Sequence, residues 1–138
     1  MEVQISLAGV LLAVFTSMVI GSVWYSKAAF GKTWMKLVGL TDEKMKEASV
    51  LPMLFMVFRA VSTAFVLSSL AFVYNSFFQN GFLNDSLMVG FWVSLILIPT
   101  MVMHDLFEGR RKKISLINGL HEFVTIMVMA LVIGLVGA

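Results

Sequence analysis

The sequence predicts an all-α membrane protein, a four-transmembrane-helix bundle that forms one membrane domain over residues 1–138. Two observations predict this class. The chain is 59% hydrophobic and 13% charged, with a mean hydropathy of +0.94, whereas soluble domains are about 45–50% apolar and about 25% charged. It also contains four segments with the roughly 20 mostly apolar residues that a helix needs to cross a bilayer. A soluble domain of this length has too little core to bury so much apolar surface.

The four expected spanning helices cover residues 3–25, 52–74, 87–107 and 114–136. The first is expected to be a retained helix, because Glu2 replaces a basic start and the apolar run exceeds the about 7–15 residues of a signal peptide core. Pro52 suits the first turn of the second helix, where a missing N–H costs nothing.

The segment 26–51 between the first two spans is predicted to lie at the cytoplasmic interface. Its aromatic and apolar residues, with Trp34 among them, are typical of a segment anchored at a membrane surface. Within it, Thr41 is expected to cap a short helix whose first turn carries Asp42 and Glu43.

The distribution of basic residues predicts the orientation. Of the ten Lys and Arg residues, five lie in segment 26–51 and four in segment 109–113. These two connections share one side of any four-span protein, and the positive-inside rule places that side in the cytoplasm. Both chain ends are then expected on the outer side.

Small residues recur every fourth position in the first span, at Gly9, Ala13, Ser17 and Gly21. Such a ridge lets two helix backbones approach closely. It is expected either to pack against a neighbouring helix of the same chain or to join subunits of a homo-oligomer. Membrane lipids are the other expected partners, since a net charge of +2 is too small to indicate nucleic acid.

Ionisable residues inside the spans are the candidates for a functional site, because lipid makes them costly. Arg59 lies seven residues after Pro52, and Glu122 lies eight residues after Ile114, so both reach about 10–12 Å into the membrane from the same side. An intramembrane Arg costs at least about 2.5 kcal/mol and needs a partner. We therefore predict an ion pair between Arg59 and Glu122, which either locks two helices together or belongs to a site.

The sequence predicts that polar groups gather in the cytoplasmic half of the bundle, with no charge in the outer half. We name this set the polar intramembrane cluster. Its members are Arg59, His104, Asp105, Glu108, Asn118, His121 and Glu122.

Metal and catalytic chemistry have little support in the sequence. No His-Glu-x-x-His or Glu-x-x-His spacing is present, so no metal site and no cofactor are expected. No catalytic residue is assigned, because Gly-rich phosphate loops and a Gly-x-Ser-x-Gly elbow are absent. A proton relay through His121 and Glu122 remains open, since His titrates near neutrality.

The third connection is a basic run that precedes the last span. Each basic residue near an anionic membrane surface contributes about 1 kcal/mol of attraction. The run is expected either to contact lipid head groups or to act only as a topology signal. It consists of Arg110, Arg111, Lys112 and Lys113.

Four short motifs resemble a known family. They are Gly21, Trp24, Tyr25, Ser26, then Phe30, Gly31, Trp34, then Phe107, Glu108, Gly109, Arg110, and last Leu116, Ile117, Asn118, His121. On these residues the chain resembles a widespread bacterial family of small membrane proteins catalogued as domain of unknown function 1761. The resemblance spans nearly the whole chain. It implies a four-helix bundle in the bacterial cytoplasmic (inner) membrane and no established activity.

The first two of these motifs define an interfacial motif. It consists of Trp24, Tyr25, Phe30, Gly31 and Trp34. We expect its turn to fold back against the bundle like a lid, with the tryptophans either packing there or serving only as interfacial anchors.

Three functions are compatible with these features. The first is a non-enzymatic bundle that binds a lipid, small molecule or protein partner from the cytoplasmic side. The second is an oligomeric proton- or ion-coupled transporter or channel, which the expected lack of charge in the outer half disfavours. The third is a membrane enzyme that uses His121 or Glu122, for which no nucleophile is evident.

Overall fold

Four long helices build the protein. The computed structural model describes residues 4–47 and 49–137, and no strand occurs among them. The helices long and apolar enough to cross a membrane are α1 (Leu7–Trp24), α4 (Leu51–Phe78), α5 (Phe82–Phe107) and α6 (Lys112–Val136). Two short helices between the first pair are α2 (Gly31–Val38) and α3 (Asp42–Lys46). The predicted all-α, four-span fold class is confirmed.

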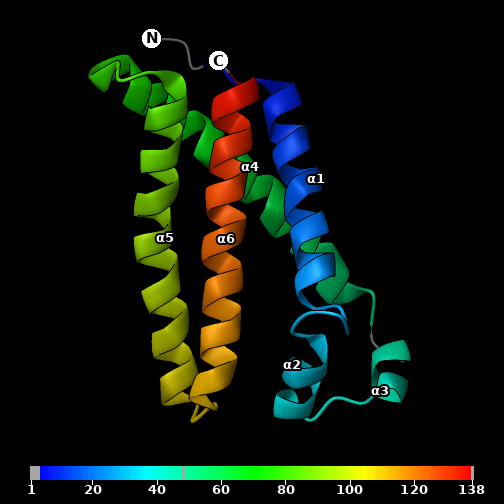
Figure 1. Cartoon of the computed structure of the whole chain (residues 1–138). Coiled ribbons are helices and arrows are strands. Elements are labelled where there is room, and N and C mark those ends of the chain that lie inside the picture. The colour runs from blue at the N-terminus through cyan, green and yellow to red at the C-terminus, as the bar shows by residue number, and fades with distance from the viewer. Residues whose placement is uncertain (1–3, 48, 138) are drawn as a thin grey trace.

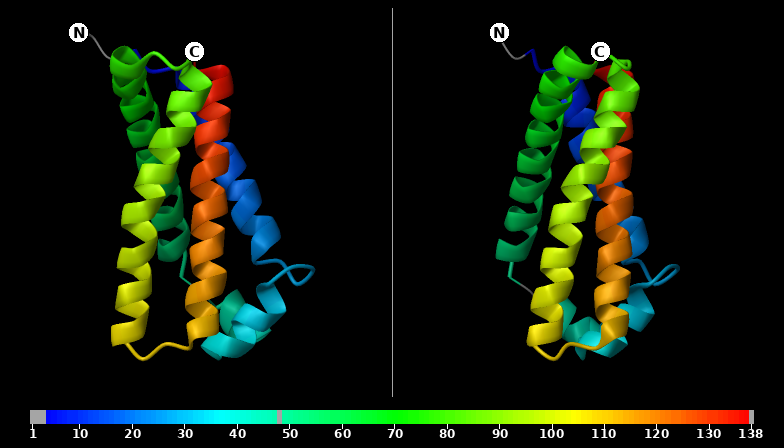
Figure 2. Two further views of the ribbon diagram at one scale, coloured as in Figure 1. Left: turned by 60° about the vertical axis from the view of Figure 1, so that its left-hand side comes forward. Right: turned by 90° about the vertical axis from the view of Figure 1, so that its left-hand side faces the viewer.

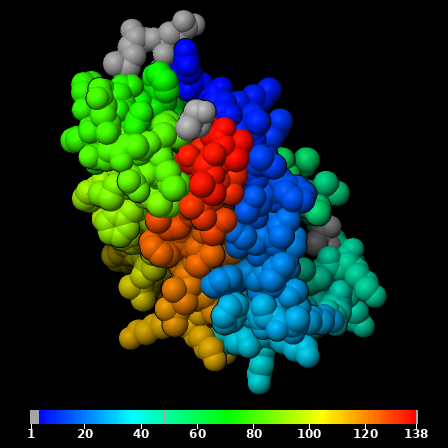
Figure 3. Space-filling view, turned by 45° about the horizontal axis from the view of Figure 1, so that its top comes forward, coloured from blue at the N-terminus to red at the C-terminus, as the bar shows by residue number. Residues whose placement is uncertain are grey.

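Helix α6 is the centre of the bundle. It packs against α1, α4 and α5 (Figures 1 and 2), and α2 of the segment between α1 and α4 also contacts it. Figure 3 shows α6 exposed along one face between α5 and α1. The buried core around it consists of Val10, Ala13, Ala64, Leu67, Ala71, Val89, Ile126, Met129 and Ile133.

The two ends of the bundle differ in charge. The segment that holds α2 and α3 lies at the same end as the α5–α6 connection (Figure 1). Nine of the ten Lys and Arg residues lie in these two connections or, for Lys112 and Lys113, in the first turn of α6. We call this the basic end. Helix α1 begins and α6 finishes at the opposite end, which we call the terminal end.

The connection between α4 and α5 is much shorter than the sequence predicts. Residues 75–86 were expected to form a loop, yet α4 continues to Phe78 and α5 already begins at Phe82. The polar residues of this stretch remain helical because their hydroxyls are satisfied by backbone carbonyls: Ser76 donates to Phe72 at 2.8 Å and Ser86 to Ala130 at 2.6 Å.

Helix α3 begins where the sequence predicts. Thr41 is the N-cap of α3, and its side chain accepts from the Lys44 N–H at 3.3 Å. Residue Gly39 ends α2 with a φ of 73°, a conformation that favours glycine. Helix α2 itself was not predicted as a helix.

Small residues bring the helices together within one chain. Ala13 and Ala130 are fully buried, and Ser17 of the predicted ridge is 8% exposed. Between α5 and α6 the backbones approach so closely that a Cβ on Gly134 would lie 2.9 Å from the Leu83 Cα, and one on Gly90 would lie 2.7 Å from the Ala130 Cβ. Three of the four residues of the α1 ridge, Gly9, Ala13 and Ser17, are thus buried inside the bundle.

Two glycines of α6 should respond differently to the same substitution. In Gly134→Ala the new methyl group meets the α5 backbone, so we expect a loss of about 1–3 kcal/mol of unfolding free energy from overpacking. In Gly119→Ala the methyl group would lie 3.6 Å from its nearest neighbours, an ordinary contact. That control should be neutral or slightly stabilising, because Ala is the better helix former.

Thermal unfolding in detergent micelles measures the difference between the two variants. A Gly134→Ala protein as stable as the Gly119→Ala protein would contradict the close α5–α6 contact.

Candidate functional site

The ion pair predicted from helix depth is present. The guanidinium of Arg59 on α4 donates to the Glu122 carboxylate on α6. The Glu122 side chain is 12% exposed, whereas that of Arg59 is 47% exposed. The buried carboxylate therefore receives its compensating charge from a neighbouring helix, and the pair joins α4 to α6 in the half of the bundle near the basic end.

A small cavity adjoins this ion pair between α1, α4 and α6. Its polar lining includes Arg59, Thr63, His121 and Thr125, and His121 Nε2 lies 3.4 Å from the Thr125 hydroxyl. The cavity volume is about 60 Å³. That is room for a few water-sized groups, well below the about 300–1,000 Å³ of small-molecule sites. The cavity is thus suited to solvate polar side chains rather than to hold an organic ligand.

Aromatic rings cover His121 on the side of the basic end. The rings of Trp24 and Tyr25 lie 5.8 and 5.0 Å from the imidazole, centroid to centroid. The Tyr25 hydroxyl donates to the Asn118 side-chain oxygen at 2.9 Å. Tyr25 follows the last residue of α1, and burial raises the pKa of its hydroxyl to about 12, with a smaller contribution from the negative charge of Glu122. The hydroxyl therefore remains a donor at neutral pH.

The interfacial motif folds back as expected, and Gly31 explains why. A Cβ at Gly31 would lie 2.2 Å from the Tyr25 carbonyl oxygen and 2.5 Å from that of Ser26, so only glycine fits. The Phe30 N–H donates to the Trp24 carbonyl at 3.0 Å. This turn places the Trp34 ring 5.3 Å from Tyr25 and the Phe30 ring 4.8 Å from Trp24. The motif thus ties α2 to the end of α1.

The polar intramembrane cluster divides into two groups. Asn118, His121 and Glu122 meet partners on α1 and α4, as described above. Asp105 and Glu108, at the end of α5, interact with the third connection instead, where Arg110 Nε lies 3.6 Å from Asp105 Oδ1 and 2.7 Å from Glu108 Oε2.

The α5 group is not a metal centre in this arrangement. His104 and Glu108 are exposed. Among residues 4–47 and 49–137, no three His, Asp or Glu side chains lie close enough together to hold a metal ion.

The structure corrects one expectation about charge. Asp85 lies at the terminal end in the first turn of α5 and is fully buried, so the expected absence of charge from that half is wrong. Its carboxylate accepts from the Asn80 backbone N–H at 3.2 Å and from the Asn80 side chain at 3.3 Å. The sequence placed Asp85 in a loop because polar neighbours hid the beginning of α5.

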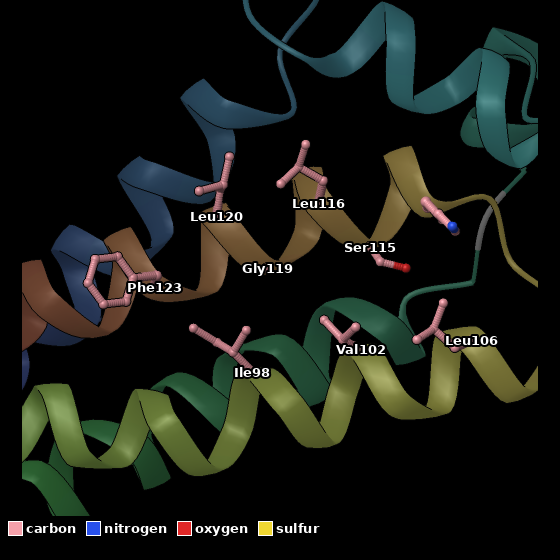
Figure 4. Close-up of a pocket in the computed structure, with 9 residues that line it drawn as sticks. Ile98, Val102, Leu106, Ser115, Leu116, Gly119, Leu120 and Phe123 are labelled. Atoms are coloured by element: carbon pink, nitrogen blue, oxygen red, sulfur yellow. The ribbon is translucent and has the colours of Figure 1, made fainter.

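A groove with a volume of about 540 Å³ lies between α5 and α6 near the basic end. Figure 4 shows Ile98, Val102 and Leu106 directed from α5 toward α6, with Ser115 facing the gap from α6. We call it the α5–α6 groove. Its lining residues are Ile98, Val102, Leu106, Lys112, Ser115, Leu116, Gly119, Leu120 and Phe123. Lys112 is the one residue among them that the sequence proposed for a site.

The groove exists because α5 and α6 are in tight contact only toward the terminal end. There Gly90 and Gly134 hold the backbones together, whereas at Gly119 a Cβ would still be 3.6 Å from Ile98 and Met101. Ser115, at the bottom of the groove, is 4% exposed, and its hydroxyl has no hydrogen-bond partner within the described part of the chain. Buried hydroxyls are normally paired. The other buried polar atoms without a partner in this part of the chain are Trp24 Nε1, Trp34 Nε1 and Asp105 Oδ2, and none of these residues lines the groove.

The Arg59–Glu122 pair can be tested with a double-mutant cycle. Arg59→Leu or Glu122→Leu alone leaves one charge unpaired and should cost about 3–5 kcal/mol of unfolding free energy. The double variant should lose less than the sum, by a coupling of about 1–3 kcal/mol. Unfolding in detergent micelles gives all four free energies, and strictly additive losses would contradict the pairing.

The exposed pair Arg110–Glu108 provides the control for that cycle. Its side chains are 48% and 55% exposed, and a cycle on Arg110→Leu and Glu108→Leu should show a coupling below about 1 kcal/mol.

Comparison with known proteins identifies the family to which the chain belongs. No curated protein and no solved structure matches the chain. A family model described as "Protein of unknown function (DUF1761)" matches residues 8–134, a range that begins in α1 and reaches the last turn of α6. This match confirms the resemblance seen in the motifs, and the chain belongs to the DUF1761 family.

Proposed function

We propose that this protein is a non-enzymatic membrane bundle that binds an amphiphilic ligand from the cytoplasmic leaflet of a bacterial inner membrane. One observation carries the proposal. The α5–α6 groove has the volume of a ligand site, an apolar wall and an unpartnered buried hydroxyl. Small-molecule sites combine a mostly apolar lining with a few placed polar groups in this way.

The length of the groove fits one lipid chain. Its lining residues on α6 extend from Lys112 to Phe123, which is about 16 Å of helix at about 1.5 Å per residue. One leaflet provides about half of a hydrocarbon core about 30 Å thick. A chain that enters beside Lys112 would therefore occupy the groove along one leaflet.

The polar groups on the opposite face of α6 support a structural role in this proposal. Glu122 is neutralised by Arg59, and Asn118 is engaged by Tyr25, so each secures a neighbouring helix to α6. A membrane enzyme based on His121 or Glu122 gains no support from this geometry, because the carboxylate is occupied by the ion pair.

Proton- or ion-coupled transport in an oligomer is the second candidate, favoured by the buried Asp85 at the terminal end. The residues between Asp85 and the Arg59 cavity argue against a path through one chain. They include the apolar side chains of Leu67, Ile126 and Met129, each at most 1% exposed, and the buried Ser68 beside Leu67 in α4.

The groove can be tested with a phosphatidylcholine that bears a diazirine on its acyl chain. Because this head group has no net charge, the probe reports the chain site alone. We expect cross-links to concentrate on the segments 98–106 and 112–123. Gly119→Leu should reduce them several-fold by filling the groove, whereas Gly119→Ala should retain them. Cross-links spread evenly over the outer surface of the bundle would contradict the proposal.

A proteoliposome flux assay separates the two candidates. We expect no proton movement above that of empty vesicles, because an apolar core layer interrupts any polar path. Proton flux that is abolished by Asp85→Asn but kept in Asn84→Ala would favour transport instead.

A further inference from the structure

We infer that the ligand of the α5–α6 groove is an anionic phospholipid, whose phosphate binds at the first turn of α6. The inference rests on the proposed function and adds the chemistry of the head group. It is carried by three features of the described residues: unpaired positive charge, an uncapped helix start, and the unpartnered Ser115 hydroxyl.

The positive charge at this place is not neutralised by the protein. Of the basic run, Arg110 is engaged by Asp105 and Glu108. The remaining members, Arg111, Lys112 and Lys113, form no ion pair with any described residue. Lys112 lines the groove, and Arg111 and Lys113 flank it in the sequence. Three of the four basic residues expected to contact lipid head groups therefore carry a charge that no described residue neutralises.

The start of α6 adds backbone donors. Arg111 is the N-cap residue of α6, and no side chain caps the first turn. The Ile114 N–H donates to the Arg111 carbonyl at 2.8 Å, whereas the amides of Lys112 and Lys113 have no hydrogen-bond partner within the described part of the chain. These two N–H groups lie at the positive end of the helix dipole, where helices bind phosphate.

Ser115 links this charged turn to the apolar groove. It follows Lys112 by three residues, so the two side chains are neighbours on one face of α6, and both line the groove. Figure 4 shows the Ser115 hydroxyl directed toward the gap between α5 and α6. Other helical hydroxyls, such as those of Thr16, Ser69 and Thr100, donate to the carbonyl four residues before. The Ser115 hydroxyl is free to bind a lipid oxygen.

The order of these groups matches one molecule. A phosphate at the uncapped turn, a polar linkage beside Ser115 and an acyl chain along Gly119 and Phe123 follow one another in the direction of α6. A second groove, between α4 and α5, is also apolar, with a volume of about 320 Å³, but it is lined by no basic residue. The α5–α6 groove is the one suited to a charged head group.

The test compares phosphatidylglycerol with phosphatidylcholine of identical acyl chains, titrated into the full-length protein in detergent and followed by native mass spectrometry. The protein should bind phosphatidylglycerol at least about tenfold more tightly, given about 1 kcal/mol for each basic residue near an anionic group. Replacing Arg111, Lys112 and Lys113 by Gln should remove this preference. Ser115→Ala should weaken the binding of both lipids several-fold, as for a lost hydrogen bond to a neutral group, because both carry the same ester linkage.

A variant of equal charge loss provides the matched control. Lys36, Lys44 and Lys46 lie at the same end of the bundle but line no part of the groove. Their replacement by Gln should leave the preference intact. An equal loss in this control would overturn the inference, because the effect would then be unspecific attraction by the basic end.

Two further outcomes are decisive. Equal affinity for both lipids, with cross-links in the groove retained, would overturn the inference that the head group is anionic, while the proposed function would still stand. Displacement of phosphatidylglycerol by inorganic phosphate at millimolar concentration would show recognition of phosphate without a chain, which also overturns the inference. Loss of groove cross-links with the neutral probe would instead remove the proposed function itself.

Discussion

Close backbone contact around α6 is the constraint on which the rest of the structure depends. Without water, helices in a membrane associate through packing, and small residues allow the nearest approach. Ala130 and Gly134 on α6 meet Gly90 and Ser86 on α5, and the Ser86 hydroxyl bonds across to a carbonyl of α6. Because this contact is confined to the half near the terminal end, the same two helices leave space near the basic end, where the α5–α6 groove forms.

The polar side chains on the two faces of α6 differ in whether a protein group pairs with them. On the face toward α1 and α4, Glu122 pairs with Arg59 of α4, and Asn118 accepts from the hydroxyl of Tyr25 at the end of α1. On the face toward α5, the Ser115 hydroxyl is left without a protein partner. A fully satisfied network stabilises one arrangement of helices, whereas an unsatisfied buried group is a place for a ligand.

Helix geometry made part of the site predictable. A helix rises by a constant amount per residue, so two residues at equal distances from the same membrane face must lie at the same depth. That reasoning was sufficient to pair Arg59 with Glu122 across 63 positions of sequence. The burial of Asp85 was not predicted, because hydropathy alone does not distinguish the polar first turn of a helix from a loop. The reasoning from depth also grouped His104, Asp105 and Glu108 with the ion pair, since depth does not report which direction a side chain faces around the bundle.

The sequence by itself determined the four spans, the placement of both basic connections at one end, the Arg59–Glu122 partnership and the turn at Gly31. The first three follow from hydropathy, charge and helix rise, which are properties of position along one helix, whereas the turn at Gly31 was expected from the motifs that resemble the family. Only the tertiary structure decided that the α1 ridge packs inside the chain, that Asp85 is buried, and that Ser115 and Gly119 line a groove. Such features depend on the angles and distances between helices, which are set by side-chain packing among segments far apart in the chain.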